Sequence, residues 1–246
     1  LLTGSLGHLK IKIFNFDLKI NAVLLIKTGI SSVSIDNAKL NLENDIKDWN
    51  FDLVKKNAED QWNNELSKIE VASANKELLS AFYTSLYHTM LAPIVFNDVN
   101  GQYKGVDGNI HLAENYTKYS IFSLWDTFRA AHPLFTVTQS ERVDDIINSM
   151  LSHYNEYGLL PVWELLGNET GTMIGYHATP VITDAILKGY NGFDVNLAYD
   201  AMRKSAMQNH LGLKYYKELG YIPDDKEVES VSKTLEYAYD DWCISQ

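Results

Sequence analysis

Near Ile35 the spacing of apolar residues changes, and no other feature constrains the fold of this sequence as strongly. In residues 9–16 apolar and polar side chains alternate, as in a half-buried strand, and residues 22–27 and 33–35 have the composition of strands. Beyond residue 51, apolar residues recur every three or four positions, which is the spacing of one face of a helix. The sequence therefore predicts strands first and helices afterwards.

Capping residues, prolines and glycines mark the ends of the expected helices. Residues 36–38 can cap a short helix, whereas residues 96–119 have no period and predict a long loop with room for a hairpin. Longer helices are expected at residues 52–69, 75–91, 122–131, 140–157, 179–188 and 194–207, and from Ser230 or Ser232 to the last residue. A mainly α chain of this kind fits a helical toroid or a solenoid, and no internal repeat is strong enough to favour the solenoid.

The charge and composition exclude several classes of function. The 246 residues carry a net charge of −11 and no basic cluster, so a nucleic acid is not an expected partner. No apolar run is long enough to form a transmembrane segment, and a single cysteine, Cys243, excludes an internal disulfide. The chain begins without Met and without a signal-peptide pattern, and we expect it to be a piece of a longer polypeptide.

The sequence lacks the common motifs of zinc sites and of hydrolase nucleophiles. It has no His-Glu-x-x-His, no Cys-x-x-Cys and no Gly-x-Ser-x-Gly. Asp98, Asn100 and Gly101 are similar to part of a calcium-binding loop, but the bidentate Glu that would complete an EF-hand is missing. We therefore assign no metal ligand from sequence patterns.

The densest group of polar and aromatic residues lies in residues 122–134. Trp125, Asp126 and Arg129 fall within five positions. An aromatic face suits the apolar side of a sugar ring, and a carboxylate accepts hydrogen bonds from vicinal hydroxyls. On a helix, Asp126 and Arg129 would share one face at i, i+3 spacing. The alternative is an Asp–Arg pair that stabilises a helix beside a core tryptophan.

A second group lies in the glycine-rich residues 161–177, which contain Trp163, Glu164, Glu169 and His177. Two glutamates five positions apart can act as general acid and general base. Equally, Glu169 can accept hydrogen bonds from backbone N–H groups, and His177 can be a hydrogen-bonded structural histidine. The residues alone leave both interpretations of Glu169 and His177 open. The presence of such polar and aromatic residues in both loop segments favours the helical toroid over the solenoid.

Together these segments resemble the signature of glycoside hydrolase family 92. The resemblance runs from about residue 26 to the end of the chain, with several independent motifs in the same order. They read Lys27-Thr-Gly-Ile-Ser31, Phe82-Tyr-Thr-x-Leu-Tyr87, Tyr103-x-Gly-x-Asp107, Ser123-Leu-Trp-Asp-Thr-Phe-Arg129, His132-Pro-Leu134, Trp163-Glu-Leu-x-x-x-Glu-Thr170, Met173-Ile-Gly-Tyr-His177 and Ile182-Thr-Asp-Ala-x-x-Lys-Gly189.

The resemblance implies a calcium-dependent exo-α-mannosidase that inverts the anomeric centre. In this family an N-terminal β-sandwich precedes an (α/α)6 barrel, with the site between them. Residues 1–34 would then be the end of the β-sandwich, 35–51 a linker, and 52–246 the N-terminal half of the (α/α)6 glycosidase domain. The expected substrate is terminal α-linked mannose, with α-1,2 linkage, in a mannose-containing oligosaccharide or N-glycan. By analogy with the family, we expect export to the periplasm, the cell surface or the medium.

The same resemblance assigns roles to the site residues. Asp126 would hold hydroxyls of the terminal mannose, and Trp125 and Arg129 would shape that pocket. The remaining residues that would line the same cavity are Glu164, Glu169 and His177.

The residues that would perform the chemistry lie elsewhere in the family. Its general acid, general base and calcium contacts belong to later Glu-Gly-Asn, Gly-Asn-Asp-Asp and Gly-Asn-Glu-Pro segments, none of which occurs in this sequence. We therefore expect the acid and base beyond Gln246, with Glu169 as a weaker candidate within the chain. We also expect calcium in the full-length enzyme, with most ligands outside these residues, and no activity from this chain alone.

Two other interpretations stay open. In the first, the chain is a non-catalytic carbohydrate-binding or structural half-barrel. In the second, it belongs to another (α/α)6 enzyme, with Glu164 and Glu169 as the catalytic pair. No residue pattern indicates an oligomeric state. If the two motif segments form one site, Asp126, Arg129 and His177 should converge with Glu169 at one end of the helical array.

Overall fold

In the computed structural model, which describes residues 2–6 and 9–246, the chain begins with an antiparallel hairpin of β1 (Leu2–Leu6) and β2 (Leu9–Ile13). Residues 22–27 and 33–35 form no strand, and residue 35 begins a helix, so the prediction of further strands there is wrong. Residues 22–26 are exposed and pair with no described strand. They therefore have neither the hydrogen-bonded ladder nor the buried face that stabilises a strand.

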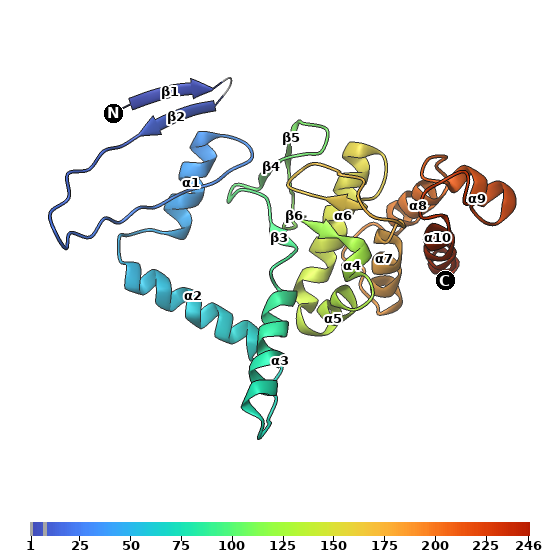
Figure 1. Ribbon diagram of the computed structural model, residues 1–246, viewed down its shortest axis with the longest axis horizontal. Helices are drawn as coiled ribbons and strands as arrows, with labels where there is room; N and C mark the ends of the chain where they lie inside the picture. The colour runs from blue at the N-terminus through green and yellow to red at the C-terminus, as the bar shows by residue number, and fades with distance from the viewer. Residues whose placement is uncertain (1, 7–8) are drawn as a thin grey trace.

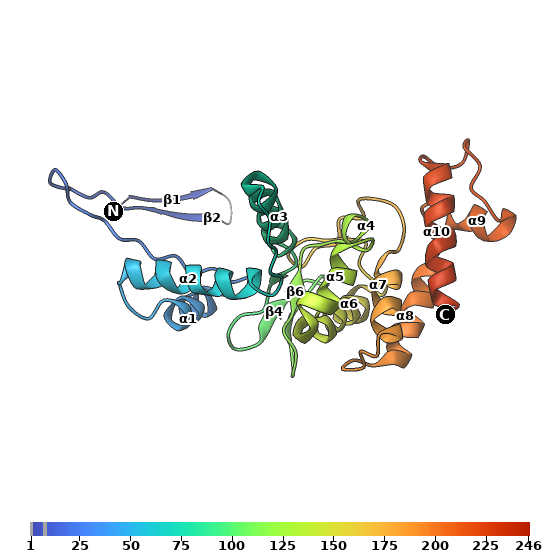
Figure 2. The same ribbon diagram turned by 90° about the horizontal axis from the view of Figure 1, so that it is seen from below.

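Three helices follow, and a side chain caps the start of each. α1 (Ile35–Asp45), α2 (Phe51–Leu66) and α3 (Lys76–Thr89) begin after Ser34, Asn50 and Asn75, whose side-chain oxygens accept hydrogen bonds from backbone N–H groups of the first turn. α2 and α3 lie close to the predicted limits, and α1 is longer than the short helix expected there. α2 has no buried residue, and with α1 and the hairpin it extends away from the later helices (Figures 1 and 2).

Short antiparallel strand pairs connect the helices. β3 (Ile94–Val95) pairs with β6 (Tyr119–Ser120), and β4 (Gln102–Lys104) pairs with β5 (Ile110–Leu112). The second pair confirms the hairpin expected within the long loop. β7 (Phe122–Ser123) pairs with β8 (Trp163–Glu164), which lies much later in the chain.

The predicted helix over residues 122–131 is wrong in part. Its first two residues form β7, α4 (Leu124–Thr127) is a single turn, and α5 (Ala131–Thr138) begins only afterwards. The partner strand β8 decides this, and a local periodicity carries no information about a distant partner. The 3-10 turn η1 (Ser140–Arg142) then leads into α6 (Val143–Tyr157). α6 ends at Gly158, whose φ of 90° is left-handed, as the glycine predicts.

Four helices complete the chain: α7 (Ala178–Leu187), α8 (Val195–Ala206), α9 (Leu213–Leu219) and α10 (Ser230–Ile244). α7, α8 and α10 lie close to the predicted limits. Asp194 caps α8 by accepting a hydrogen bond of 3.0 Å from the backbone N–H of Leu197. The prediction missed α9, because a helix of seven residues is too short to establish a periodic pattern.

The main core lies where α6, α7 and α8 pack together. Ile147, Ile182 and Ala198 are completely buried there. Phe122 and Leu124 belong to the same cluster, so the polar segment that follows them is anchored directly to the core. A smaller cluster joins α9 to α10.

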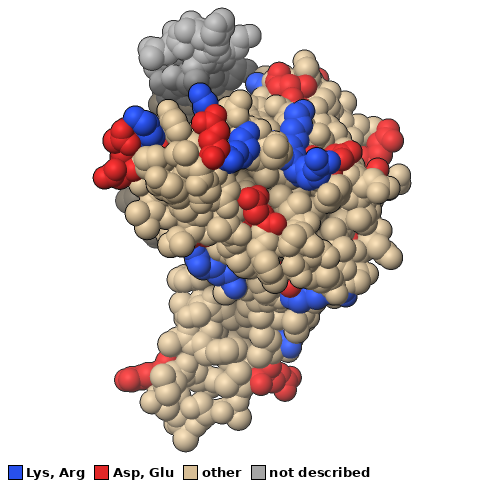
Figure 3. Space-filling view, turned by 90° about the vertical axis from the view of Figure 1, so that its right-hand side faces the viewer, with Lys and Arg blue, Asp and Glu red and all other residues tan. Residues whose placement is uncertain are grey.

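The helices from α5 to α8 and α10 form an open array, and the described part of the chain closes no barrel (Figure 1). The prediction of a mainly α chain is confirmed. α10 leaves Val231, Leu235 and Trp242 exposed. Figure 3 shows this end of the molecule, where charged side chains gather along the upper part of the face and uncharged residues cover much of the remainder. None of the helices in the described residues is long and apolar enough to span a membrane.

Candidate functional site

The two motif segments identified in the sequence are neighbours in space. In the β7–β8 pair, Phe122 lies opposite Glu164 and Ser123 lies opposite Trp163. α4 begins at the next residue, so its side chains start from the edge of the second segment. A site shared by both segments is therefore geometrically possible.

α4 carries the carboxylate to which the resemblance gave the main role. Asp126 is exposed, and the hydroxyl of Ser123 donates a hydrogen bond to its Oδ2. The adjacent Trp125 is half-buried, and its Nε1 is buried without a hydrogen-bond partner among the described residues. Because a buried indole N–H normally has a partner, α4 presents both an accessible acceptor and an unused donor.

Arg129 and His177 meet at a third residue, Glu236 of α10. One amino nitrogen of Arg129, Nη2, donates to Glu236 Oε1 at 2.6 Å. His177 Nε2 lies 3.2 Å from Glu236 Oε2, without the alignment of a hydrogen bond. The Glu236 carboxylate therefore bridges a guanidinium and an imidazole that come from the two motif segments.

A buried carboxylate supports the other side of His177. His177 Nδ1 lies 2.8 Å from Asp240 Oδ1, and the backbone N–H of Tyr176 donates to Asp240 Oδ2 at 2.8 Å. The side chains of His177 and Asp240 are 1% and 0% exposed. Burial raises the pKa of Asp240, against the opposing effect of His177 and the Tyr176 N–H. The pair fixes the orientation of the imidazole ring.

Phe128 completes this group. Its ring stacks on His177 with centroids 4.0 Å apart, and the guanidinium carbon of Arg129 lies 4.7 Å from the centre of the same ring. A cation over the face of an aromatic ring contributes about 0.5–1 kcal/mol at an exposed site. Phe128 thus couples Arg129 to His177 by packing, in addition to the polar bridge through Glu236.

Glu164 directs its carboxylate into its own loop. It accepts hydrogen bonds from the Ser120 hydroxyl at 2.8 Å, the Ile121 N–H at 3.1 Å and the Gly167 N–H at 2.6 Å. Glu164 is 2% exposed. Burial raises the pKa of Glu164, although these hydrogen bonds oppose the rise.

Glu169 is engaged in the same way. It accepts from the N–H groups of Val162 at 2.9 Å, Trp163 at 3.0 Å and Gly171 at 2.7 Å, and its side chain is 6% exposed. His153 Nε2 lies 3.5 Å from Glu169 Oε2. Burial lowers the pKa of His153. The two glutamates therefore hold the glycine-rich loop in shape through backbone amides.

The structure brings the predicted residues together unequally. Arg129 and His177 share the Glu236 carboxylate, and Asp126 lies on the turn that precedes Arg129. Glu164 and Glu169 belong to the adjoining loop, but their carboxylates are occupied by Ser120 and by backbone N–H groups. Their assignment to substrate binding stays a prediction.

Sequence reasoning missed Glu236 and Asp240. A signal was available, because the two acids are four positions apart on the last expected helix and therefore share one face. That spacing alone is common on solvated helices, and only the fold reveals that the buried partner of this face is His177.

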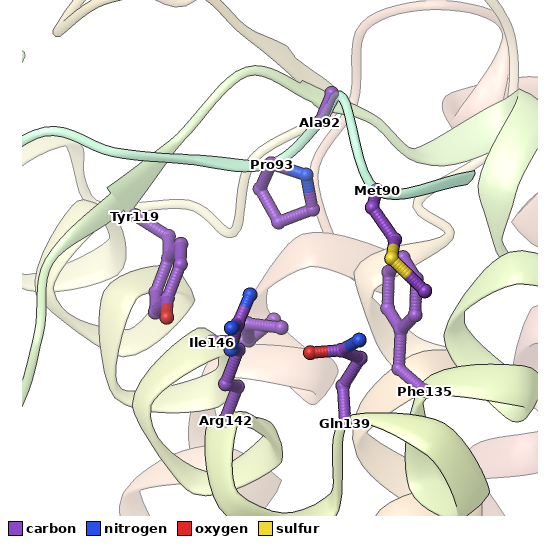
Figure 4. Close-up of a pocket in the computed structure, with 8 residues that line it drawn as sticks. All are labelled: Met90, Ala92, Pro93, Tyr119, Phe135, Gln139, Arg142 and Ile146. Carbon is purple, nitrogen blue, oxygen red and sulfur yellow. The ribbon is translucent and has the colours of Figure 1, made fainter. Parts of the chain in front are cut away.

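Three cavities among the described residues are lined by neither Arg129, His177 nor Glu236. A cavity of about 20 Å³ lies between the turn after α3 and the helices α5 and α6, where it has room for one or two water molecules (Figure 4). A cavity of about 50 Å³ borders Glu169 and Tyr176. A wider hollow, about 870 Å³, lies between α1 and residues 94–99 and borders the glycine-rich loop only at Leu166.

One group of potential metal ligands occurs in the described residues. Ligand atoms of Asp107, His111 and Glu156 lie within 4.8 Å of one another. All three side chains are already hydrogen-bonded: Asp107 to His111 and Asn109, and Glu156 to the Tyr103 hydroxyl. The mixed set of one imidazole and two carboxylates differs from the oxygen ligands that calcium prefers.

The partial calcium-loop pattern has a structural role. Asp98 is buried and accepts hydrogen bonds from the side chains of Ser31, Asn37 and Asn41. It therefore joins α1 and the segment before it to the β3–β4 connection.

Residues 37–246 match the model of a protein family described as the glycosyl hydrolase family 92 catalytic domain. Among solved structures, the chain is 48% identical to a family 92 α-mannosidase of Bacteroides thetaiotaomicron, with a TM-score of 0.83 over 87% of this chain. That α-mannosidase has also been solved with bound mannoimidazole. The chain is 36% identical to a family 92 inverting mannosidase of the same species, with a TM-score of 0.82 over 87% of this chain.

A curated relative is an uncharacterized secreted glycosidase of Arthroderma benhamiae, which is 26% identical over 89% of this chain. The chain spans only part of these relatives. It covers 27% of the Arthroderma protein and 29% and 30% of the two Bacteroides mannosidases.

Proposed function

Because this chain belongs to glycosyl hydrolase family 92, whose catalytic-domain model it matches over residues 37–246, we propose that it forms part of an exo-acting α-mannosidase. The resemblance drawn from the sequence motifs is confirmed by this match and by the identities of 48% and 36% to family 92 mannosidases. The open helical array is a partial form of the same catalytic domain.

The contact between the two motif segments carries the proposal. Phe128 stacks on His177, and Ser123 pairs with Trp163, so an aromatic, a carboxylate and a guanidinium are grouped on one anchored turn. A pyranose offers vicinal hydroxyls that donate and accept, together with an apolar ring face. The grouping matches those requirements.

We assign the residues of this chain to binding and positioning. Asp126 accepts hydrogen bonds from hydroxyls of the terminal mannose, and Arg129 and Trp125 shape its pocket. Glu164 and Glu169 contribute through the loop that they hold, because their carboxylates are already bonded within it. Hydrogen bonds that tighten as the ring distorts would add several kcal/mol to catalysis.

Calcium enters only as an expectation from the family. Calcium takes six to eight oxygen ligands, whereas the group of Asp107, His111 and Glu156 contains an imidazole and Asp240 is bonded to His177 and Tyr176. We therefore assign no ligand here and derive no step through the ion.

Several finer points belong to the same proposal. We propose inversion, because one relative is described as an inverting mannosidase, and export, because another is described as secreted. We also propose an α-1,2-linked mannoside or N-glycan as substrate. The domain limits stay as the sequence suggests: 1–34 as the end of a β-sandwich, 35–51 as a linker and 52–246 as half of an (α/α)6 domain.

A second candidate function is non-catalytic sugar binding. The occupied carboxylates of Glu164 and Glu169 favour it, because neither is free to act as acid or base in this arrangement. The third interpretation, with these two glutamates as the catalytic pair, requires those hydrogen bonds to break.

The experiment is a hydrolysis assay on the complete natural polypeptide with α-1,2-, α-1,3- and α-1,6-mannobiose, with the product anomer followed by NMR. We expect release of β-mannose from the α-1,2 substrate. Asp126→Ala should lower kcat/KM by about 100-fold or more, whereas Asp200→Ala, an exposed aspartate on α8, should leave it unchanged. No hydrolysis with retained mannose binding would favour the second candidate.

A further inference from the structure

We propose that Glu236 is a sugar-contacting carboxylate of this site, and that Asp240 is a positioning residue that acts on Glu236 through His177. The proposal rests on the proposed function and adds two residues on α10 that the sequence motifs did not indicate.

The first observation is a graded line of polar groups. The exposed fraction of the side chain is 0% for Asp240, 1% for His177, 17% for Glu236 and 57% for Arg129. Each group contacts the next at 2.8, 3.2 and 2.6 Å. The line therefore runs from the core to the surface and ends in a carboxylate and a guanidinium that solvent reaches.

The second observation is that the inner half of the line is rigid. Asp240 is held by the Tyr176 N–H at 2.8 Å, and the His177 ring is held by Asp240 and by the face of Phe128. A buried carboxylate and imidazole cost free energy of desolvation, and well-placed hydrogen bonds offset that cost only in part. Such groups occur often at functional sites, where a fixed orientation has a use.

The third observation concerns what the outer half can bind. A carboxylate accepts from two vicinal hydroxyls, and the adjacent guanidinium of Arg129 donates to a hydroxyl or ring oxygen. Tyr239, 44% exposed, has its ring centroid 5.8 Å from that of Phe128, the ring on which the guanidinium of Arg129 lies. A charged acceptor, a charged donor and an aromatic face together suit a neutral sugar.

The alternative is that these residues only stabilise the packing of α7 on α10. The two roles predict different behaviour for Glu236, because a purely structural carboxylate has no effect on a sugar that never touches it. Asp241 provides the matched control. It is the next acid on α10 and accepts from the Tyr176 hydroxyl at 2.6 Å. No hydrogen bond or ion pair joins it to Arg129 or His177 in the described residues.

The experiment measures mannoimidazole binding by calorimetry on the complete natural polypeptide, with thermal unfolding as a check of the fold. We expect Glu236→Gln to raise Kd about 10- to 100-fold, the loss of one charged hydrogen bond, while Tm stays near that of the wild type. Asp241→Asn should change Kd less than about twofold.

A double-mutant cycle tests the positioning role. Asp240→Asn should weaken binding about 3- to 10-fold in the wild type, and should have no further effect in the Glu236→Gln background, because it acts through that carboxylate. His177→Gln, which keeps a polar side chain at this position, should bind more tightly than His177→Ala. Full additivity of Asp240→Asn and Glu236→Gln would overturn the positioning role.

If Asp240→Asn does not fold, Glu236→Gln still decides the main point. Unchanged binding by Glu236→Gln, with weakened binding by Asp126→Ala, would overturn the inference and leave the proposed function intact. A wild-type protein that neither binds mannoimidazole nor hydrolyses a mannoside would overturn both.

Discussion

The ring of Phe128 lies on the imidazole of His177, with centroids 4.0 Å apart and planes inclined by 15°. The two residues belong to different motif segments. Because the guanidinium of Arg129 rests on the same phenyl ring, a shift of the imidazole also reaches the exposed cation. His177 therefore links the second segment to the first, in addition to the β7–β8 pair.

Gly175 controls the space that His177 occupies. Its φ is 82°, and a Cβ at this position would overlap Nε2, Cε1 and Cδ2 of the imidazole. Gly171 is its matched control, since its φ is 61° and a Cβ there meets no atom within 4 Å. We expect Gly171→Ala to cost about 1 kcal/mol from the positive φ alone. Gly175→Ala should cost about 2 kcal/mol more, because the buried ring must move.

Urea denaturation, monitored by circular dichroism, measures the loss of unfolding free energy in each variant. Mannoimidazole binding by the complete polypeptide reports the displacement of the His177 ring. An equal cost for the two variants would show that His177 moves without resistance, contrary to its packing between Phe128 and Asp240.

The sequence predicted features that depend on neighbouring residues. Gly158 ends α6 and Asp194 caps α8, since a turn or a cap needs only the adjacent residues. The same logic failed at Phe122, which pairs with a strand about forty positions later. The sequence analysis expected Arg129 and His177 in one site, but it did not reveal that Glu236 joins them, because that carboxylate lies on α10.

The candidate glutamates show the same limit. The sequence offered Glu169 either as an acid or base or as an acceptor for backbone N–H groups, and spacing alone did not decide. The fold places three amides around its carboxylate, since the chain doubles back between Trp163 and Gly171. This loop closure depends on positive φ at several residues, which periodicity does not encode.

His132 should make stability depend on pH. Burial lowers its pKa from 6.5 to about 4. The folded state therefore binds no proton at this ring until well below the pH at which the unfolded state does. The contribution of neutral His132 to the unfolding free energy is fully present above pH 6.5 and is lost as the pH falls towards 4. Between pH 7 and pH 4.5 we expect a loss of about 2–3 kcal/mol from this group.

The check compares wild type with His132→Leu, which has a similar volume and no titrating group, in urea at both pH values. His153 also has a lowered pKa, but it is present in both proteins and cancels in the difference. Equal losses of unfolding free energy in the two proteins would contradict the assignment.

Glu169 should prove necessary for the loop that surrounds it. Glu169→Ala leaves the N–H groups of Val162, Trp163 and Gly171 without their acceptor, and we expect a cost of about 2–4 kcal/mol in unfolding free energy. Glu114→Ala, at an exposed position, should change stability by less than about 0.5 kcal/mol. Hydrogen exchange of the three amides locates the effect, and unchanged protection in Glu169→Ala would refute the structural role.

Residues 1–246 alone should hydrolyse no mannoside at a useful rate. The leaving oxygen needs a proton and the anomeric carbon needs an activated water, and each contribution from a positioned acid or base is worth about 10²–10⁴ in rate. The in-chain candidates, Glu164 and Glu169, are bonded to backbone N–H groups and are 2% and 6% exposed, so neither is free for proton transfer. Binding a substrate through Asp126 and Glu236 without preference for the transition state does not raise turnover.

The measurement is mannobiose hydrolysis with calcium present, on this chain and on the complete polypeptide. Turnover by this chain that Glu169→Gln abolishes, while Glu114→Gln leaves it unchanged, would show that the Glu169 carboxylate leaves its three amides during the reaction and acts as a catalytic residue.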